Sequence, residues 1–219
     1  MAVATSASAQ GAPTTVKAPK FTNDTTPTFE WSGATDPSPS SGIGGYTVEI
    51  WKADGSAKAR GPYTVPHGAD PHTWTLPEED AFAGSGADDG EYQIRVWTCD
   101  TDGNTGADFG SCTFLLDTQP PVLSNVRPTG WDGSRQQILA DFTDACAGLD
   151  KSKTEVKQAY NGISWDIKME QISGLPTYND GDRQITIGKF MPGWYCDGEW
   201  TFTMVAYDRA GNRSDELVW

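Results

Sequence analysis

The chain has 219 residues, which is enough for one large domain or for two domains of about 100 residues each. Its formal net charge of −14 argues against nucleic acid and anionic membrane surfaces as partners, because both attract lysine and arginine, whereas it permits divalent cations. No apolar run approaches the roughly 20 residues that cross a bilayer, so no membrane insertion is expected.

The first residues are small and weakly apolar. Ala7-Ser8-Ala9 has the small-x-small pattern of a signal-peptidase site, which would mark the remnant of a secretory signal peptide. A flexible chain end explains the same composition equally well. Residues 1–12 are therefore assigned to a flexible N-terminus, with both interpretations open.

Short segments of alternating apolar residues follow, joined by the turns that 24 glycines and 14 prolines provide. Alternation is typical of half-buried strands, since successive side chains of a strand point to opposite faces. The segments are Thr28–Trp31, Tyr46–Ile50, His72–Leu76 and Ile138–Phe142. The stretch Lys151–Tyr160 fits an amphipathic helix as well as a strand.

An internal repeat is the clearest pattern. Asp89–Val96 recurs without a gap as Asp197–Met204, 108 residues later. Turn residues at the same spacing are Asp100, Gly103 and Asn104, then Asp208, Gly211 and Asn212. A spacing of this size is typical of one β-sandwich domain, so the repeat indicates a duplication.

The segment Asp117-Thr118-Gln119-Pro120-Pro121 separates the two copies. Neither proline can donate a ladder hydrogen bond, so residues 118–121 are predicted to form a short, stiff linker. The expected fold is all-β, with two tandem antiparallel β-sandwiches over residues 13–117 and 122–219. The last strand, Glu216–Trp219, stops abruptly, so the natural protein is expected to continue past it.

These segments resemble two related families. Pro27–Trp31, Tyr46–Val48 and Asp89–Tyr92 are similar to bacterial fibronectin III-like repeats. Ala140-x-Phe142-x-Asp144, Gly148-Leu149-Asp150 and Asp208-x-x-Gly211-Asn212 resemble bacterial Ig-like domains. The resemblance implies Ig-like or fibronectin III-like sandwiches. It implies little about function, because such modules occur in adhesins, surface fibres and accessory regions of secreted enzymes.

An enzyme is not expected. The chain has two histidines, His67 and His72, which with Asp70 could form a weak metal site. Gly68 and Pro71 favour instead two exposed histidines in a loop before a strand. The HExxH, GxSxG and phosphate-binding motifs are absent from the sequence.

Calcium is the one cofactor that the acidic residues suggest. The turn Asp100–Asn104 has the D-x-D-x-N spacing of calcium loops, but its glycine comes two positions early, which favours a plain turn. A second arrangement gathers carboxylates of both domains around the linker, where an ion would remove their mutual repulsion. Its candidate ligands are Asp88, Asp89, Glu91, Asp117, Asp144 and Asp208. The alternative is a solvated acidic turn.

Trp51, Arg95 and Trp97 are predicted to lie on the outer face of a sheet, because they have the opposite parity from the core residues of their strands. Exposed aromatic rings beside an arginine could bind a sugar ring or a protein partner. The two indoles should lie at opposite ends of neighbouring strands. This favours tryptophans that pack on the Arg95 stem or a nearby loop.

Four cysteines fit an oxidising compartment. Cys99 ends one strand and Cys112 begins the next, so a disulfide across this hairpin is predicted, although Cys112 shares the parity of core residues. Cys146 and Cys196 should lie at opposite poles of the second domain, whereas the even number of cysteines favours a bridge. That pairing stays open.

The expected function is a non-catalytic structural or adhesive module, acting as a spacer or interaction domain of a secreted or cell-surface bacterial protein. The alternative is a carbohydrate- or protein-binding accessory module of a secreted enzyme. Expected partners are other domains of the same polypeptide and a surface protein or glycan.

Overall fold

The computed structural model describes residues 10–37, 41–127, 137–150, 152–160, 163–167, 184–189 and 200–218. The chain divides into two compact units, Met1–Leu116 and Asp117–Trp219. The described residues form β-strands and one 3-10 turn, η1 (Glu78–Asp80), so the chain is all-β. The part of Lys151–Tyr160 that has regular structure is a strand, not a helix. No helix among the described residues is long and apolar enough to cross a membrane.

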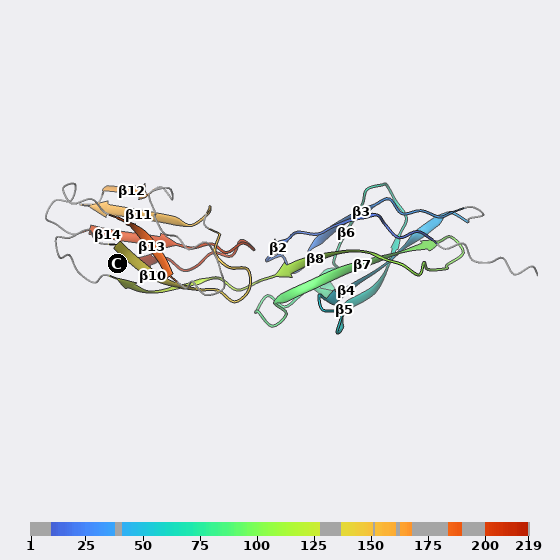
Figure 1. The fold of residues 1–219 in the computed structure, drawn as a ribbon, viewed down its shortest axis with the longest axis horizontal. Helices are drawn as coiled ribbons and strands as arrows, with labels where there is room; N and C mark the ends of the chain where they lie inside the picture. The colour runs from blue at the N-terminus through green and yellow to red at the C-terminus, as the bar shows by residue number, and fades with distance from the viewer. Residues whose placement is uncertain are drawn as a thin grey trace, which may run out of the picture. The chain divides into compact units, whose positions relative to one another are not determined.

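The first unit contains two sheets (Figure 1). A three-stranded sheet has the order β1-β3-β6, and a five-stranded sheet has the order β2-β8-β7-β4-β5. The β2–β8 pair is parallel and the other pairs are antiparallel. The strands are β1 Thr15–Lys17, β2 Phe21–Thr22, β3 Thr28–Ser32, β4 Ile43–Lys52, β5 Lys58–Pro66, β6 His72–Thr75, β7 Gly90–Asp100 and β8 Gly110–Leu116.

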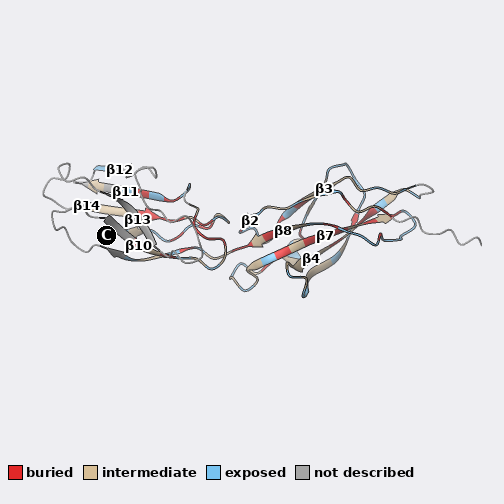
Figure 2. Ribbon diagram, in the orientation of Figure 1, coloured by how far each residue is buried: buried red, intermediate tan, exposed pale blue. Residues whose placement is uncertain are grey.

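The core of the first unit lies between these two sheets. Along β7, Tyr92, Ile94 and Val96 are each at most 1% exposed, and the residues between them are partly exposed (Figure 2). Phe29 of β3 meets Phe114 of β8 edge to face, with 5.3 Å between the ring centroids. This contact joins the two sheets, because the two strands belong to different sheets.

The second unit also contains two sheets, with the orders β13-β10-β9 and β12-β11-β14-β15. All of their pairs are antiparallel. Buried residues of this unit include Phe142, Val156 and Met204. The strands are β9 Val122–Arg127, β10 Gln137–Thr143, β11 Glu155–Tyr160, β12 Ile163–Ile167, β13 Gln184–Lys189, β14 Trp200–Val205 and β15 Leu217–Val218.

The repeated Asp-x-x-Gly-Asn motif forms a tight turn after β7 and again after β14. The backbone N–H of Asp208 donates to the carbonyl of Asn212 at 3.1 Å, which closes the turn in the second unit. Gly211 has a φ of 100°, a left-handed conformation that strains any residue with a Cβ atom. The glycine is therefore required by the turn that presents the Asp208 carboxylate.

The predicted disulfide between Cys99 and Cys112 is not formed. Cys112 lies opposite Ile94, five positions before Cys99 along β7. Five strand residues span about 17 Å, whereas the Cα atoms of a disulfide lie within roughly 7 Å. Cys112 also packs against the core, while Cys99 lies on the other face of the sheet. Cys196 lies outside the described residues, so its pairing with Cys146 stays a prediction.

Candidate metal site

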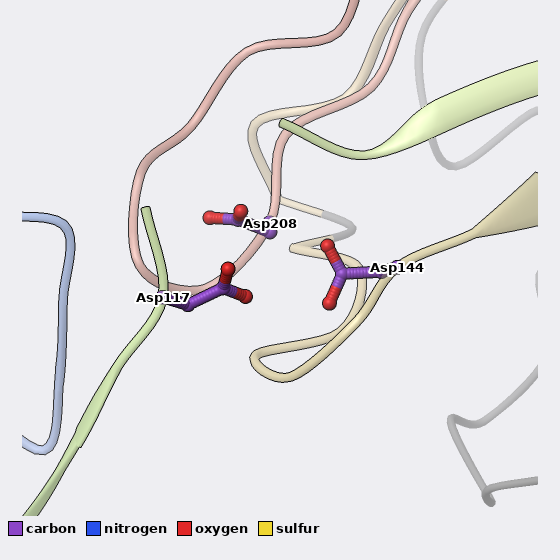
Figure 3. A group of neighbouring side chains, drawn as sticks. All are labelled: Asp117, Asp144 and Asp208. Carbon is purple, nitrogen blue, oxygen red and sulfur yellow. The ribbon is translucent and has the colours of Figure 1, made fainter. Parts of the chain in front are cut away.

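Three aspartates meet at one end of the second unit. Asp117 follows β8 directly, Asp144 follows β10 directly, and Asp208 lies in the turn after β14. One carboxylate oxygen of each lies within 4.8 Å of the others (Figure 3). Segments that are far apart in the sequence therefore bring three negative charges into one small space.

Asp208 is completely buried and is held by its own turn. Its Oδ1 accepts hydrogen bonds from the backbone N–H groups of Gly211 at 2.7 Å and Asn212 at 2.9 Å. Its Oδ2 accepts from the side-chain amide of Asn212 at 2.7 Å. These donors fix the carboxylate and satisfy part of its hydrogen-bonding capacity, which lowers the cost of burying it.

Asp117 is also completely buried. Its Oδ2 accepts a 2.6 Å hydrogen bond from the backbone N–H of Ala147, and its Oδ1 accepts from that of Gln119 at 3.2 Å. Ala147 belongs to the loop that also carries Asp144, so this bond holds two of the three ligand segments together.

Asp144 is the carboxylate whose charge is least compensated. Its Oδ1 accepts from the backbone N–H groups of Gly148 at 2.6 Å and Cys146 at 3.2 Å. Its Oδ2 is buried and has no hydrogen-bond partner among the described residues. Burial raises the pKa of this carboxyl to about 6, and the charges of Asp117 and Asp208 add to the rise.

Such an arrangement suits a hard divalent cation. Calcium binds six to eight oxygen ligands, and ionised carboxylates are its strongest ligands in proteins. A cation would neutralise three carboxylates that repel one another in a buried space, and it would give the Asp144 Oδ2 atom a partner. The donor set contains no sulfur or imidazole, which disfavours zinc and copper.

Three of the six predicted calcium ligands form this group, and the other three belong to the first unit. Asp88 lies in the first unit, where its Oδ2 accepts from Arg60 at 2.9 Å and from the N–H of Ala83 at 2.8 Å. Asp89 lies in the turn before β7, and Glu91 is exposed on that strand. The expectation that carboxylates of both domains gather in one group around the linker stays a prediction for these three residues.

The histidines belong to an aromatic cluster of the first unit. The ring of His72 lies 4.8 Å from that of Trp31 and 5.3 Å from that of Tyr46, centroid to centroid. Burial lowers the pKa of His72. The prediction of two exposed loop histidines is therefore right for His67 and wrong for His72, which begins β6 and is half-buried.

Trp51, Arg95 and Trp97 are connected through a residue that the sequence did not single out. The guanidinium of Arg95 lies 4.5 Å from the ring centroid of Trp51 and 5.0 Å from that of Phe109. Phe109 in turn lies 5.0 Å from Trp97. The four side chains form a continuous row of contacts, which we call the aromatic ladder. The positive charge of Arg95 thus faces two rings of the protein itself.

Part of the second unit matches a known family. Residues 122–216 match the family model of the bacterial Ig-like domain, which confirms the resemblance seen in the sequence. The match begins after Asp117 and includes Asp144 and Asp208. No curated protein matches the chain.

Several solved structures are similar to the chain at low identity. One is a tetra-tandem repeat from the extending region of a large adhesion protein, with 16% identity, 96% of this chain and 49% of that chain covered, and a TM-score of 0.39. The FN1–FN3 domains of chicken CNTN1 have 13% identity, coverages of 96% and 65%, and a TM-score of 0.39. The fibronectin(III)-like modules of Clostridium thermocellum CbhA have 13% identity, coverages of 93% and 91%, and a TM-score of 0.37.

The chain thus spans about half the length of the first of these structures. All three TM-scores lie below 0.5, so nothing about its function follows from these similarities.

Proposed function

Because residues 122–216 match the family model of the bacterial Ig-like domain, we propose that this chain is a non-catalytic structural module whose second unit is stabilised by Ca²⁺. In this proposal the two units are tandem β-sandwiches that act as a spacer or interaction domain of a secreted or cell-surface protein. Bacterial Ig-like domains often occur in extracellular proteins, where millimolar calcium is available to weak sites.

The observation that carries the calcium proposal is the buried Oδ2 atom of Asp144, which lies beside Asp117 and Asp208 and has no hydrogen-bond partner within the part of the chain that the structure describes. A buried polar atom without a partner destabilises the folded state, and a buried charge costs more than a neutral polar group. An ion that binds only the folded unit would offset this cost. It would contribute about 2.7 kcal/mol to stability at a free concentration one hundred times its dissociation constant.

The fold also supports a mechanical role for the ion. Asp117 begins the second unit, Asp144 follows β10, and Asp208 follows β14. The strands β10 and β14 belong to different sheets. One ion bound to all three carboxylates would therefore connect the start of the unit to both of its sheets, which opposes their separation under load.

The experiment is a calcium titration of the intact chain by isothermal calorimetry at neutral pH. One site is expected in the second unit, and Asp144→Asn should abolish it, because the variant replaces a charged ligand oxygen with an amide of the same shape. Asp215→Asn is the matched control, since Asp215 is an exposed aspartate of the same unit outside the group. Equal calcium binding by Asp144→Asn and by the unsubstituted chain would contradict the proposal.

A further inference from the structure

The first unit contains a copy of the aspartate turn with nearly the same hydrogen bonds. The N–H of Asp100 donates to the carbonyl of Asn104 at 3.0 Å, as the N–H of Asp208 does to that of Asn212 at 3.1 Å. The Asn104 side-chain amide donates to the Asp100 Oδ2 atom at 2.8 Å. In the second unit the corresponding bond between Asn212 and Asp208 measures 2.7 Å.

The second carboxylate of the site is duplicated too. Asp36 precedes Asp144 by 108 residues, the same spacing that separates Asp100 from Asp208. The N–H of Gly42 donates to the Asp36 Oδ2 atom at 2.8 Å, as that of Gly148 does to Asp144. In both aspartates the other carboxylate oxygen is buried and has no hydrogen-bond partner among the described residues.

One further bond joins the loop that follows Asp36 to the turn of Asp100. The carbonyl of Gly42 accepts from the N–H of Thr101, which follows Asp100. The carbonyl of Gly148 accepts from the N–H of Arg209, which follows Asp208, so the two loops are fixed to the two turns in the same way. The loop and the turn that carry two of the aspartates are therefore joined by the same backbone hydrogen bond in both units.

Among the described residues of the first unit, no third carboxylate forms a group with Asp36 and Asp100. The 108-residue spacing pairs Asp117 with Ala9, which is followed by Gln10 and Gly11. The residue that reaches the turn is Gln10, which is 5% exposed and donates its side-chain amide to the Asp100 Oδ2 atom at 2.9 Å. Gly11 pairs with Thr35, which holds Gln10 next to the loop of Asp36. Gln10 thus brings an amide donor to the carboxylate of Asp100, whereas Asp117 brings a third negative charge to the group in the second unit.

We propose that Gln10 takes the place of the cation in the first unit and determines that only the second unit binds Ca²⁺. The Asp100 Oδ2 atom accepts two amide hydrogens, from Gln10 and from Asn104, so its charge is compensated without an ion. With two carboxylates in place of three, the first unit also attracts a divalent cation less strongly. This inference rests on the calcium site proposed for the second unit.

The inference predicts that a single substitution transfers calcium dependence to the first unit. Gln10→Asp would complete a set of three carboxylates with Asp36 and Asp100. In EDTA the added charge should repel the other two, and the turn at 100–104 should exchange its backbone amides faster than in the unsubstituted chain. With Ca²⁺ at ten times the dissociation constant, exchange in this turn should slow by about tenfold.

Hydrogen exchange read by mass spectrometry tests this on the intact chain, because peptides that cover 100–104 and 208–212 report on the two units separately. Gln10→Asp is made together with Asp144→Asn, so that any calcium effect comes from the new site. Thr113→Asp is the control, since it adds the same charge at an exposed position on β8.

Calcium-dependent protection of 100–104 in the Gln10→Asp chain alone would support the inference. The same protection in a chain that keeps Gln10, or none after Gln10→Asp, would overturn it. The peptide that covers 208–212 in the unsubstituted chain tests the proposed function separately. A lack of calcium response there would reject the second-unit site and leave the Gln10→Asp result as an independent test of the role of Gln10.

Discussion

The side-chain amide of Asn212 donates a 2.7 Å hydrogen bond to the backbone carbonyl of Asp117, 95 residues earlier in the chain. The same amide group donates to the carboxylate of Asp208 at 2.7 Å. One buried side chain therefore holds two of the three candidate ligand residues, one through its backbone and the other through its carboxylate.

Replacing Asn212 should weaken the second unit whether or not calcium is present. Asn212→Ala removes both side-chain bonds and leaves a buried carbonyl and a buried carboxylate with fewer donors, which should cost about 1–3 kcal/mol. Urea unfolding of the intact chain in EDTA measures the loss. Asn104→Ala removes one of the corresponding bonds in the first unit, so this variant should lower the free energy of unfolding of the first unit. An unchanged free energy of unfolding of the second unit in Asn212→Ala would contradict the structural role of Asn212.

The pH dependence of the calcium-free protein follows from Asp144. Its pKa in the folded chain is raised to about 6, mainly by burial, from an ordinary value of 3.8. Between these values the folded state binds more protons than the unfolded state, so the second unit should lose stability as pH rises from about 4 to about 6. The difference in melting temperature between the unsubstituted chain and Asp144→Asn in EDTA isolates this effect. A difference that is independent of pH would contradict it.

Calcium should reverse that trend. The ion binds the ionised carboxylates, and protons compete with it below the pKa of Asp144. The rise in melting temperature on adding Ca²⁺ should therefore be larger at pH 7 than at pH 5. A rise of equal size at both values would show that the cation acts elsewhere.

The aromatic ladder should contribute to the stability of the first unit. Arg95→Ala removes the cation–π contacts with Trp51 and Phe109 and should cost about 0.5–2 kcal/mol. Thermal unfolding measures this cost, and Arg95→Lys, which keeps the charge but not the planar group, should lose less. Unchanged stability together with glycan-array binding that disappears in Arg95→Ala would favour the alternative function of a sugar-binding accessory module.

Reducing agents should leave the first unit unchanged. Cys99 and Cys112 are free thiols on opposite faces of the sheet, so both should be alkylated once the chain is unfolded without a reductant. Peptide mass spectrometry after alkylation detects the two modified residues. A peptide pair joined through Cys99 and Cys112 would contradict the register of β7 and β8.

The sequence predicted the parts of this account that depend on local pattern. The alternation of apolar residues predicted which face of β7 is buried, and the repeated Asp-x-x-Gly-Asn motif predicted the turn that holds Asp208. The expected gathering of carboxylates around the linker suggested Asp88 as a calcium ligand, and it could not show that Arg60, 28 residues earlier, pairs with that carboxylate. The position of Phe109 between Arg95 and Trp97 depends on the path of a loop, which periodicity does not determine.

The most direct test of the central claim is a crystal structure of the intact chain grown with Ca²⁺. We expect one ion in the second unit, with oxygens of Asp117, Asp144 and Asp208 at about 2.3–2.6 Å, and amide hydrogen bonds from Gln10 in place of an ion in the first unit. An ion bound away from these three carboxylates, or a buried Asp144 Oδ2 atom that meets only water or a protein donor at saturating calcium, would contradict it.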